Sequence, residues 1–165
     1  MNALIIFSAQ YLYLLVIAIT AVCFFIIPKD QKRNFGLLLI IALPCIYLIS
    51  KVAANFYFDP RPFVVGHFAP LIPHAPDNGF PSDHVLLTSA ISSVVFAYNK
   101  KVSAVLWALT IIVGLARILV GVHHLIDIAG AITISILVTA VIDYLLKKQK
   151  VFIYRYKTLT GRIIL

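Results

Sequence analysis

The stretch from Asp59 to His84 reads DPRPFVVGHFAPLIPHAPDNGFPSDH, and it interrupts a chain that is otherwise mostly apolar. It is rich in proline and holds three of the five histidines, three of the six acidic residues and one arginine. A polar, proline-rich segment between two long apolar runs is typical of a loop outside the membrane. We therefore expect the chemistry of the protein to lie in and around this loop.

The loop ends in Phe80-Pro81-Ser82-Asp83-His84, directly before an apolar run of helical character. Ser82 is a preferred N-cap residue, so Asp83 and His84 are predicted to lie in the first turn of a helix. Free backbone N–H groups and the positive end of the helix dipole would then lie beside a histidine. This arrangement favours a site for an anionic group.

A second polar stretch, Ala116 to Asp127, reads ARILVGVHHLID. Arg117 and His123 are six residues apart, and Asp127 follows His123 by four. On a helix, a spacing of four puts the imidazole and the carboxylate on one face, where the carboxylate can orient the ring and stabilise its cation. Taken alone, such a pair is more often a polar pair at a helix end than a catalytic dyad, although ionisable groups near a membrane are often functional.

The composition indicates an integral membrane protein. The chain has 165 residues, of which 62% are hydrophobic, and its mean hydropathy is +1.01, whereas soluble domains are about 45–50% apolar. We expect one transmembrane domain, residues 1–150, followed by a basic cytoplasmic tail, residues 151–165. The formal charge of +8 does not indicate a nucleic-acid partner, because the basic residues cluster between apolar spans as the positive-inside rule describes.

The apolar pattern predicts an all-α, polytopic transmembrane helix bundle of about five spans, at residues 5–27, 35–56, 83–98, 102–120 and 123–146. The loops after the first and third spans, together with the tail, carry 11 of the 14 Lys and Arg residues. The positive-inside rule therefore places these loops in the cytoplasm and the amino terminus outside. Both polar stretches then fall on the outer face, where their side chains can converge.

The two stretches together resemble the type 2 phosphatidic acid phosphatase (PAP2) superfamily, whose pattern is Lys-x6-Arg-Pro, Pro-Ser-Gly-His and Ser-Arg-x5-His-x3-Asp. The matches lie in the family's order between residues 51 and 127, and they are Arg61-Pro62, Pro81-Ser82-Asp83-His84, Arg117, His123 and Asp127. The sequence PRPFV followed by FPSDH, with Asp83 in place of the family's glycine, is similar to that of bacterial undecaprenyl-diphosphate phosphatases associated with bacitracin resistance.

The resemblance implies hydrolysis of a phosphate ester or diphosphate through a covalent phosphohistidine. His123 would be the nucleophile, oriented by Asp127, and His84 would protonate the leaving oxygen and later activate water. Arg61 and Arg117 would clamp the phosphoryl oxygens, because the guanidinium group suits bidentate contact.

Three further residues, Ser82, Asp83 and Lys51, complete the expected phosphate-binding set. Ser82 and the first N–H groups of the third span would add hydrogen-bond donors. No metal or other cofactor is expected, because the arginines and the helix end supply the positive field. A metal site formed by His67, His74 and His84 is an alternative that lacks any compact ligand spacing.

The chain departs from the family pattern at three points. The family lysine would fall at Ala54, whereas Lys51 lies three residues earlier, about one helical turn away. Lys51 is therefore either a lysine that extends to the membrane surface or a displaced phosphate ligand. The family serine is replaced by Ala116, and relatives commonly have six spans or an extra amphipathic segment at the amino end.

By resemblance, the expected substrate is undecaprenyl diphosphate, a polyprenyl diphosphate lipid of the membrane. Removal of its terminal phosphate would give undecaprenyl phosphate and recycle the carrier for peptidoglycan synthesis. The expected location is the bacterial inner (plasma) membrane, multi-pass, with the active site on the extracytoplasmic face. The alternatives are a phosphatidylglycerophosphate or phosphatidic acid phosphatase and a non-catalytic membrane scaffold that kept the fold.

Overall fold

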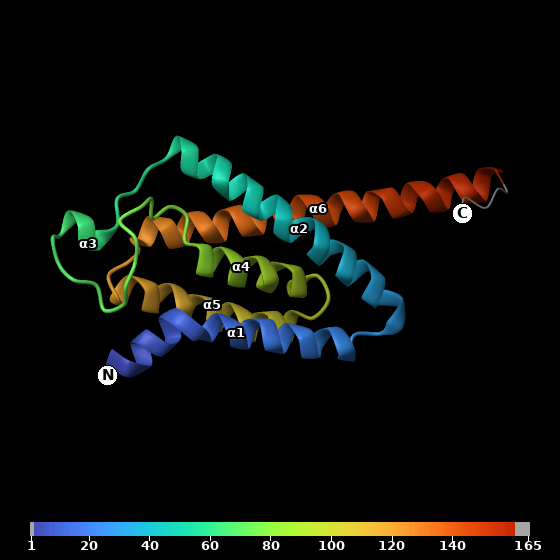
Figure 1. Ribbon diagram of the computed structural model, residues 1–165. Helices are drawn as coiled ribbons and strands as arrows, with labels where there is room; N and C mark the ends of the chain where they lie inside the picture. Colours follow the sequence, from blue (N-terminus) through green and yellow to red (C-terminus); the bar gives the residue numbers. More distant parts are fainter. Residues whose placement is uncertain (1, 161–165) are drawn as a thin grey trace.

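The computed structural model describes residues 2–160, with side chains placed for residues 2–149, and this part of the chain contains helices and no strand. The helices are α1 (Asn2–Ile26), α2 (Lys29–Phe56), α3 (Pro62–Val65), α4 (Asp83–Phe96), α5 (Lys100–Leu119) and α6 (Leu125–Thr160). Apart from the short α3, these helices form one bundle, in which α4, α5 and α6 run along a common direction and α2 crosses them obliquely (Figure 1). The predicted all-α bundle is confirmed.

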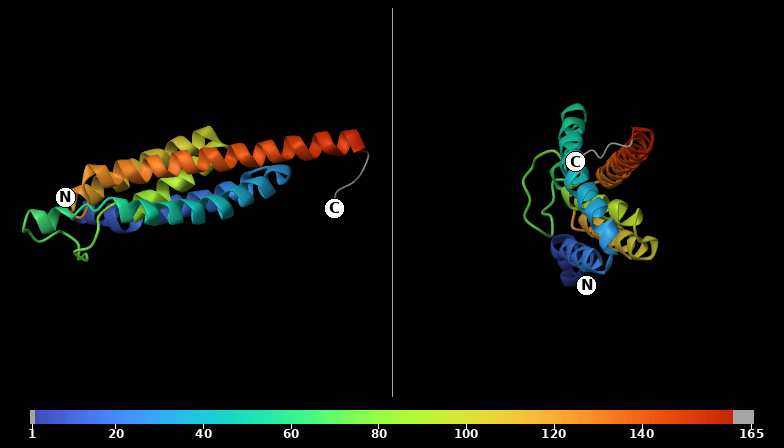
Figure 2. Two further views of the ribbon diagram at one scale, coloured as in Figure 1. Left: turned by 90° about the horizontal axis from the view of Figure 1, so that it is seen from above. Right: turned by 90° about the vertical axis from the view of Figure 1, so that its right-hand side faces the viewer.

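Helix α4 lies at the centre of the bundle and contacts α1, α2, α5 and α6. Those four neighbours are long and apolar enough to cross a membrane. α4 has only 14 residues, of which nine are buried, so it is short, as the sequence predicts, and is enclosed by the others. Figure 2 shows the bundle from above and along its axis, with α6 extending beyond its neighbours at the carboxyl end.

Small polar side chains join α4 to its neighbours. The Ser89 hydroxyl donates to Ser135 Oγ of α6 at 2.8 Å, and Ser92 and Thr110 share a hydrogen bond of 3.1 Å between α4 and α5. Ser103 of α5 donates to the Ser92 carbonyl at 2.8 Å. Small residues let helices approach closely in a membrane, and their hydroxyl groups satisfy one another across the interface. α4 is therefore firmly held, and its first turn is a fixed platform for the site.

The loop between α2 and α4, which contains α3, lies over one end of the bundle together with the turn between α5 and α6 (Figure 1). Asn78 fastens this loop to the end of α2. Its Oδ1 accepts the backbone N–H groups of Asp59 and Phe80, and its Nδ2 donates to the carbonyls of Ala54 and Tyr57. All four hydrogen-bonding positions of this one amide are thus used.

Several helix boundaries differ from the predicted spans: α2 begins at Lys29 and not at residue 35, and two further differences concern the site and the tail. The last span was expected to begin at His123, but α6 begins at Leu125, and His123 lies in the preceding turn. α6 then continues without a break to Thr160, so it passes the expected domain boundary at residue 150. The tail's residues 161–165 lie outside the described part of the chain, and the division into a domain and a tail stays a prediction.

Gly121 follows the C-cap residue of α5, and its backbone has a φ of +82°. A left-handed conformation of this kind favours glycine. A Cβ atom at this position would also lie 2.6 Å from the ring of Phe68. The turn therefore requires glycine both for its backbone and for the loop that packs on it.

Candidate active site

The imidazole of His123 is buried and held from both sides in the turn between α5 and α6. Its Nδ1 lies 3.0 Å from Oδ2 of Asp127. Its Nε2 faces two guanidinium groups, at 3.3 Å from Nη2 of Arg117 and 3.5 Å from Nη1 of Arg61. The two polar stretches of the sequence therefore converge on one histidine.

The sequence spacing had predicted that His123 and Asp127 share one face of a helix. The structure shows another origin for their contact. Asp127 is in the first turn of α6, and its Oδ2 also accepts the backbone N–H of His124 at 2.9 Å. A carboxylate at the third helical position commonly reaches back to the N-cap in this way. The loop closes over it, since a Cβ on Gly79 would lie 2.9 Å from Asp127 Oδ2. The start of the helix thus fixes the carboxylate under the ring.

These contacts determine the tautomer of His123. The Asp127 carboxylate accepts the hydrogen on Nδ1, which leaves the lone pair on Nε2 directed toward the arginines. Burial is the main cause that lowers the pKa of His123; the hydrogen bond to Asp127 opposes it, and the charges of Arg117 and Arg61 lower the pKa further. The ring is therefore neutral at neutral pH, which is the form that can act as a nucleophile.

Arg61 is buried at the N-cap position of α3, and the protein holds its side chain at three points. Its Nε donates to Oδ1 of Asp77 at 2.7 Å, its Nη1 to the Val122 carbonyl at 2.9 Å and its Nη2 to the Asn78 carbonyl at 3.3 Å. Burial raises the pKa of Asp77, but the hydrogen bond and charge of Arg61 outweigh this effect and leave the pKa lowered. The guanidinium is thus fixed in orientation before any ligand arrives.

Arg117 lies in the last turn of α5 and is almost fully buried. Its Nε has no hydrogen-bond partner among the residues described. A buried guanidinium with an unused donor is costly. A phosphoryl oxygen is the type of acceptor that this group binds best.

A polar cavity of about 300 Å³ opens in front of His123. Six of the eight predicted site residues line it, and they are Lys51, Arg61, Asp83, His84, Arg117 and His123. The other two, Ser82 and Asp127, are fully buried and do not line the cavity. The structure therefore brings the predicted residues together, while their individual roles stay predictions.

His84 lies in the first turn of α4 and lines the cavity together with His123. Its ring packs edge-on against Tyr13 of α1, with centroids 5.0 Å apart and planes at 89°. The sequence pattern did not identify Tyr13, because a tyrosine within an apolar span carries no motif. His74, which the sequence offered only as a member of an alternative metal site, also lines the cavity, 6.2 Å from His123 between ring centroids.

Lys51 reaches the cavity from α2, although it lies one turn before Ala54, which also lines it. Its Nζ is 3.5 Å from Oδ1 of Asp83, and both side chains are largely exposed, at 49% and 68%. The ammonium also lies 4.9 Å from the ring centre of Tyr47. The charge of Lys51 therefore lies at the rim of the cavity, and its role as a displaced phosphate ligand stays a prediction.

Ser82 occupies the predicted N-cap position of α4, but its hydroxyl does not make the expected cap bond. The side chain is fully buried, and its Oγ has no hydrogen-bond partner within residues 2–149. The Ser82 backbone N–H donates to the Asp127 carbonyl at 3.3 Å. Ser82 therefore ties the start of α4 to that of α6, and its role as a phosphate ligand stays a prediction.

Asp59, His124 and Asp127 form a group whose potential metal-ligand atoms all lie within 4.8 Å of one another, among the residues described. This group differs from the set of three histidines that the sequence offered as an alternative. His124 Nδ1 is hydrogen-bonded to Asp59 Oδ2 at 2.8 Å, and Asp127 is engaged with His123. The existing hydrogen bonds account for the arrangement.

Comparison with known structures shows the same fold. Aquifex aeolicus LpxE superposes with a TM-score of 0.66 at 23% identity, over 84% of each chain. The transmembrane PAP2-type phosphatidylglycerolphosphate phosphatase from Bacillus subtilis gives a TM-score of 0.65 at 22% identity, over 89% of this chain and 77% of that one. These similarities concern the arrangement of the helices.

Comparison of sequences identifies the family. Undecaprenyl-diphosphatase BcrC of Bacillus subtilis is 32% identical over 84% of this chain and 71% of its own length. The bacitracin transport permease protein BcrC of Bacillus licheniformis is 28% identical over 83% of this chain and 68% of its own length. The PAP2 superfamily pattern matches residues 33–150. The chain therefore belongs to the PAP2 superfamily and is a multi-pass membrane phosphatase.

Proposed function

We propose that the protein hydrolyses undecaprenyl diphosphate to undecaprenyl phosphate and inorganic phosphate through a phosphohistidine on His123. One observation carries this proposal. The neutral, buried imidazole directs the lone pair of Nε2 to a point between Arg61 and Arg117, while Asp127 holds Nδ1. A nucleophile beside two clamps for phosphoryl oxygens is the arrangement that phosphoryl transfer requires.

In the first step, the arginines bind the oxygens of the terminal phosphate, and His123 Nε2 attacks its phosphorus. A nitrogen–phosphorus bond forms as the bond to the bridging oxygen breaks, and the lipid monophosphate leaves. His84 donates a proton to the leaving oxygen, and Asp127 stabilises the positive charge that develops on the imidazole. In the second step, His84 accepts a proton from water as the water attacks phosphorus, which releases phosphate and restores His123.

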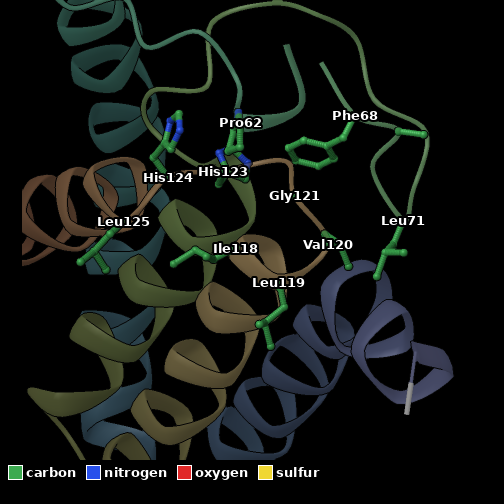
Figure 3. Close-up of a pocket in the computed structure, with 11 residues that line it drawn as sticks. Pro62, Phe68, Leu71, Ile118, Leu119, Val120, Gly121, His123, His124 and Leu125 are labelled. Carbon is green, nitrogen blue, oxygen red and sulfur yellow. The ribbon is translucent and has the colours of Figure 1, made fainter. Parts of the chain in front are cut away.

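An apolar cavity of about 470 Å³ next to His123 supports a substrate with a hydrocarbon tail. Figure 3 shows Phe68 above Gly121 on one side of it, and Leu119 and Leu125 on the other. Leu119 and Leu125 are 62% and 70% exposed, as expected for side chains that face the bilayer. Each buried CH₂ group contributes about 0.8 kcal/mol, so a long prenyl tail held in the bilayer would anchor its diphosphate at this site.

The distribution of charge supports an active site on the extracytoplasmic face. The basic residues at the start of α2 and at the start of α5 lie at the end of the bundle opposite α3 (Figure 1), whose N-cap residue Arg61 lines the cavity. The positive-inside rule favours a cytoplasmic location for those helix ends. Cysteines introduced at Ala69 and Gln149, in a background without Cys23 and Cys45, test this topology. We expect an impermeant reagent added outside to label only Ala69→Cys, and labelling of Gln149→Cys alone would contradict it.

Phosphatidylglycerophosphate is the second candidate substrate. A phosphatidylglycerophosphatase B of Bacillus subtilis is 26% identical over 79% of this chain and 65% of its own length. The polar cavity would accept the monoester phosphate of that lipid in the same way. The two candidates differ in the number of phosphates that the cavity must hold, and Lys51 at the rim favours the diphosphate by adding a third positive charge.

The decisive experiment compares kcat/KM of the purified protein for undecaprenyl or farnesyl diphosphate, phosphatidylglycerophosphate and phosphatidic acid. We expect the prenyl diphosphates to be preferred. Preference for either glycerolipid would reject the substrate and leave the histidine mechanism standing. Absence of turnover for all of them, with an intact fold, would support the non-catalytic scaffold.

A further inference from the structure

A second cavity, of about 690 Å³, lies between α4, α5 and α6 toward the other end of the bundle. We call it the basic-end groove; its lining includes Phe96, Lys100, Trp107, Thr139, Asp143 and Lys147. Ser93, its first α4 residue, is nine residues beyond His84, which is about 14 Å along a helix. The groove is therefore separate from the active site.

The groove contains a buried hydroxyl group that the described protein does not satisfy. Thr139 is 4% exposed and lines the groove, and its Oγ1 has no hydrogen-bond partner within the described part of the chain. Ser135, one turn earlier on α6, accepts from Ser89 and donates to the Leu86 carbonyl. Buried hydroxyl groups in helix bundles normally have partners, so the Thr139 hydroxyl indicates an occupant with a polar atom at this depth.

The charged residues of the groove indicate the charge of that occupant. Lys147 Nζ is 2.6 Å from Oδ2 of Asp143, and Lys100 Nζ lies 5.6 Å from the centre of the Phe96 ring. Two lysines against one aspartate leave the groove with one net positive charge. Basic pockets between transmembrane helices on the cytoplasmic side bind anionic lipid head groups. A phosphodiester with a single negative charge would neutralise the groove.

We propose that the basic-end groove binds an anionic diacyl phospholipid, such as phosphatidylglycerol. Its phosphodiester lies against Lys100 and Lys147, and an acyl chain follows the apolar wall at Phe96 and Trp107. Thr139 is eight residues from Lys147, about 12 Å along α6, so its hydroxyl donates to an ester carbonyl oxygen below the head group. A prenyl phosphate has no such carbonyl, and this distinguishes the proposed ligand from the product of the active site.

Native mass spectrometry of the full-length protein in detergent, with added phosphatidylglycerol or phosphatidylcholine, tests this proposal. We expect preferential retention of phosphatidylglycerol. The pair Lys100→Gln and Lys147→Gln should reduce retention about tenfold or more, and Thr139→Val should reduce it about fivefold through loss of one hydrogen bond. The matched pair Lys101→Gln and Lys148→Gln, whose exposed lysines lie outside the groove lining, should leave retention unchanged.

Thermal unfolding in detergent reports folding, and its midpoint should stay close to that of the unmodified protein for all these variants. Equal retention of both phospholipids, or an equal loss in the control pair, would overturn the proposal. Displacement of phosphatidylglycerol by a prenyl monophosphate at equal concentration would also overturn it, because the groove would then hold the product lipid. None of these outcomes depends on the substrate assignment.

Discussion

The two walls of the catalytic cavity are built in different ways. Arg61, Arg117 and His123 on one wall are buried, and backbone carbonyls and carboxylates hold Arg61 and His123. On the other wall, Lys51 and Asp83 are largely exposed and form a single ion pair of 3.5 Å. The difference shows where the geometry is preorganised for phosphoryl transfer and where the site can adapt to the head group of its lipid.

Burial explains why the first wall is rigid. A buried charge is tolerated only when partners with good geometry surround it, and removal of one partner is costly. An exposed ion pair contributes about 0–1 kcal/mol, since solvent screens it. Substitutions in the first wall should therefore have large effects, and those at the rim small ones.

The largest difference in activity between matched substitutions on the two walls is expected for Arg117→Lys. The substitution keeps the positive charge and removes the planar pair of donors, so kcat should fall by about 10²–10³. Steady-state kinetics on a prenyl diphosphate measure this, with Lys51→Arg as the matched exchange on the opposite wall. A loss below threefold in Arg117→Lys would mean that charge alone suffices, contrary to a fixed clamp.

A second substitution tests the loop that supports the first wall and leaves the buried side chains of that wall unchanged. Asn78→Ala removes four hydrogen bonds between the loop and α2 and should lower the free energy of unfolding by about 1–3 kcal/mol. Asn78→Asp keeps the two hydrogen bonds that Oδ1 accepts, so its free energy of unfolding should lie between those of the unmodified protein and Asn78→Ala. Thermal unfolding in detergent measures the shift. Equal stability of all three proteins would show that the loop is held elsewhere.

The pH dependence concerns His123 on the first wall. Burial and the two arginines lower the pKa of His123, so its nucleophilic form persists below the ordinary histidine value of about 6.5. As pH falls through the lowered pKa, the ring gains a proton and activity is lost. Nitrogen NMR of the labelled ring, together with the kcat/KM profile, should give a midpoint below that value. Asp127→Asn removes the contact that raises the pKa and should lower the NMR midpoint further; an upward shift would contradict the account.

The smallest effect is expected at the rim. Lys51→Gln removes a half-exposed charge that already pairs with Asp83, so KM for a diphosphate should rise by about threefold, with little change in kcat. The increase should shrink at high salt because the charge is screened. A fall in kcat as large as that of Arg117→Lys would place Lys51 in the clamp, and the contrast between the walls would be lost.

The sequence could predict the helices and the motif residues because both are local patterns. Long apolar runs define the spans. Arg117, His123 and Asp127 lie close together in the sequence, at and around the turn that joins α5 to α6. The predicted reason for the His123–Asp127 contact was wrong. A separation of four residues brings two side chains together on one helical face, but it also does so when the first residue precedes the helix and the second lies in its first turn. Only the boundary at Leu125 distinguishes the two arrangements.

The remaining features depend on contacts between distant parts of the chain. Asn78 fastens the loop to α2, and Tyr13 of α1 packs on His84, yet neither belongs to a periodic or motif pattern. The sequence also left Lys51 open between two interpretations. Its position one turn from Ala54 brings its charge to the cavity rim only because α2 ends beside α4, which is a property of the packed bundle.

The covalent intermediate on His123 is the central claim, and rapid quenching with a prenyl diphosphate labelled at its terminal phosphate tests it most directly. We expect an acid-labile, base-stable phosphoryl group on His123, with a higher yield in His84→Ala, where water is no longer activated. His123→Ala should show neither the label nor turnover while its thermal unfolding stays close to that of the original protein. Substantial turnover by His123→Ala, or a label on another residue, would contradict the account.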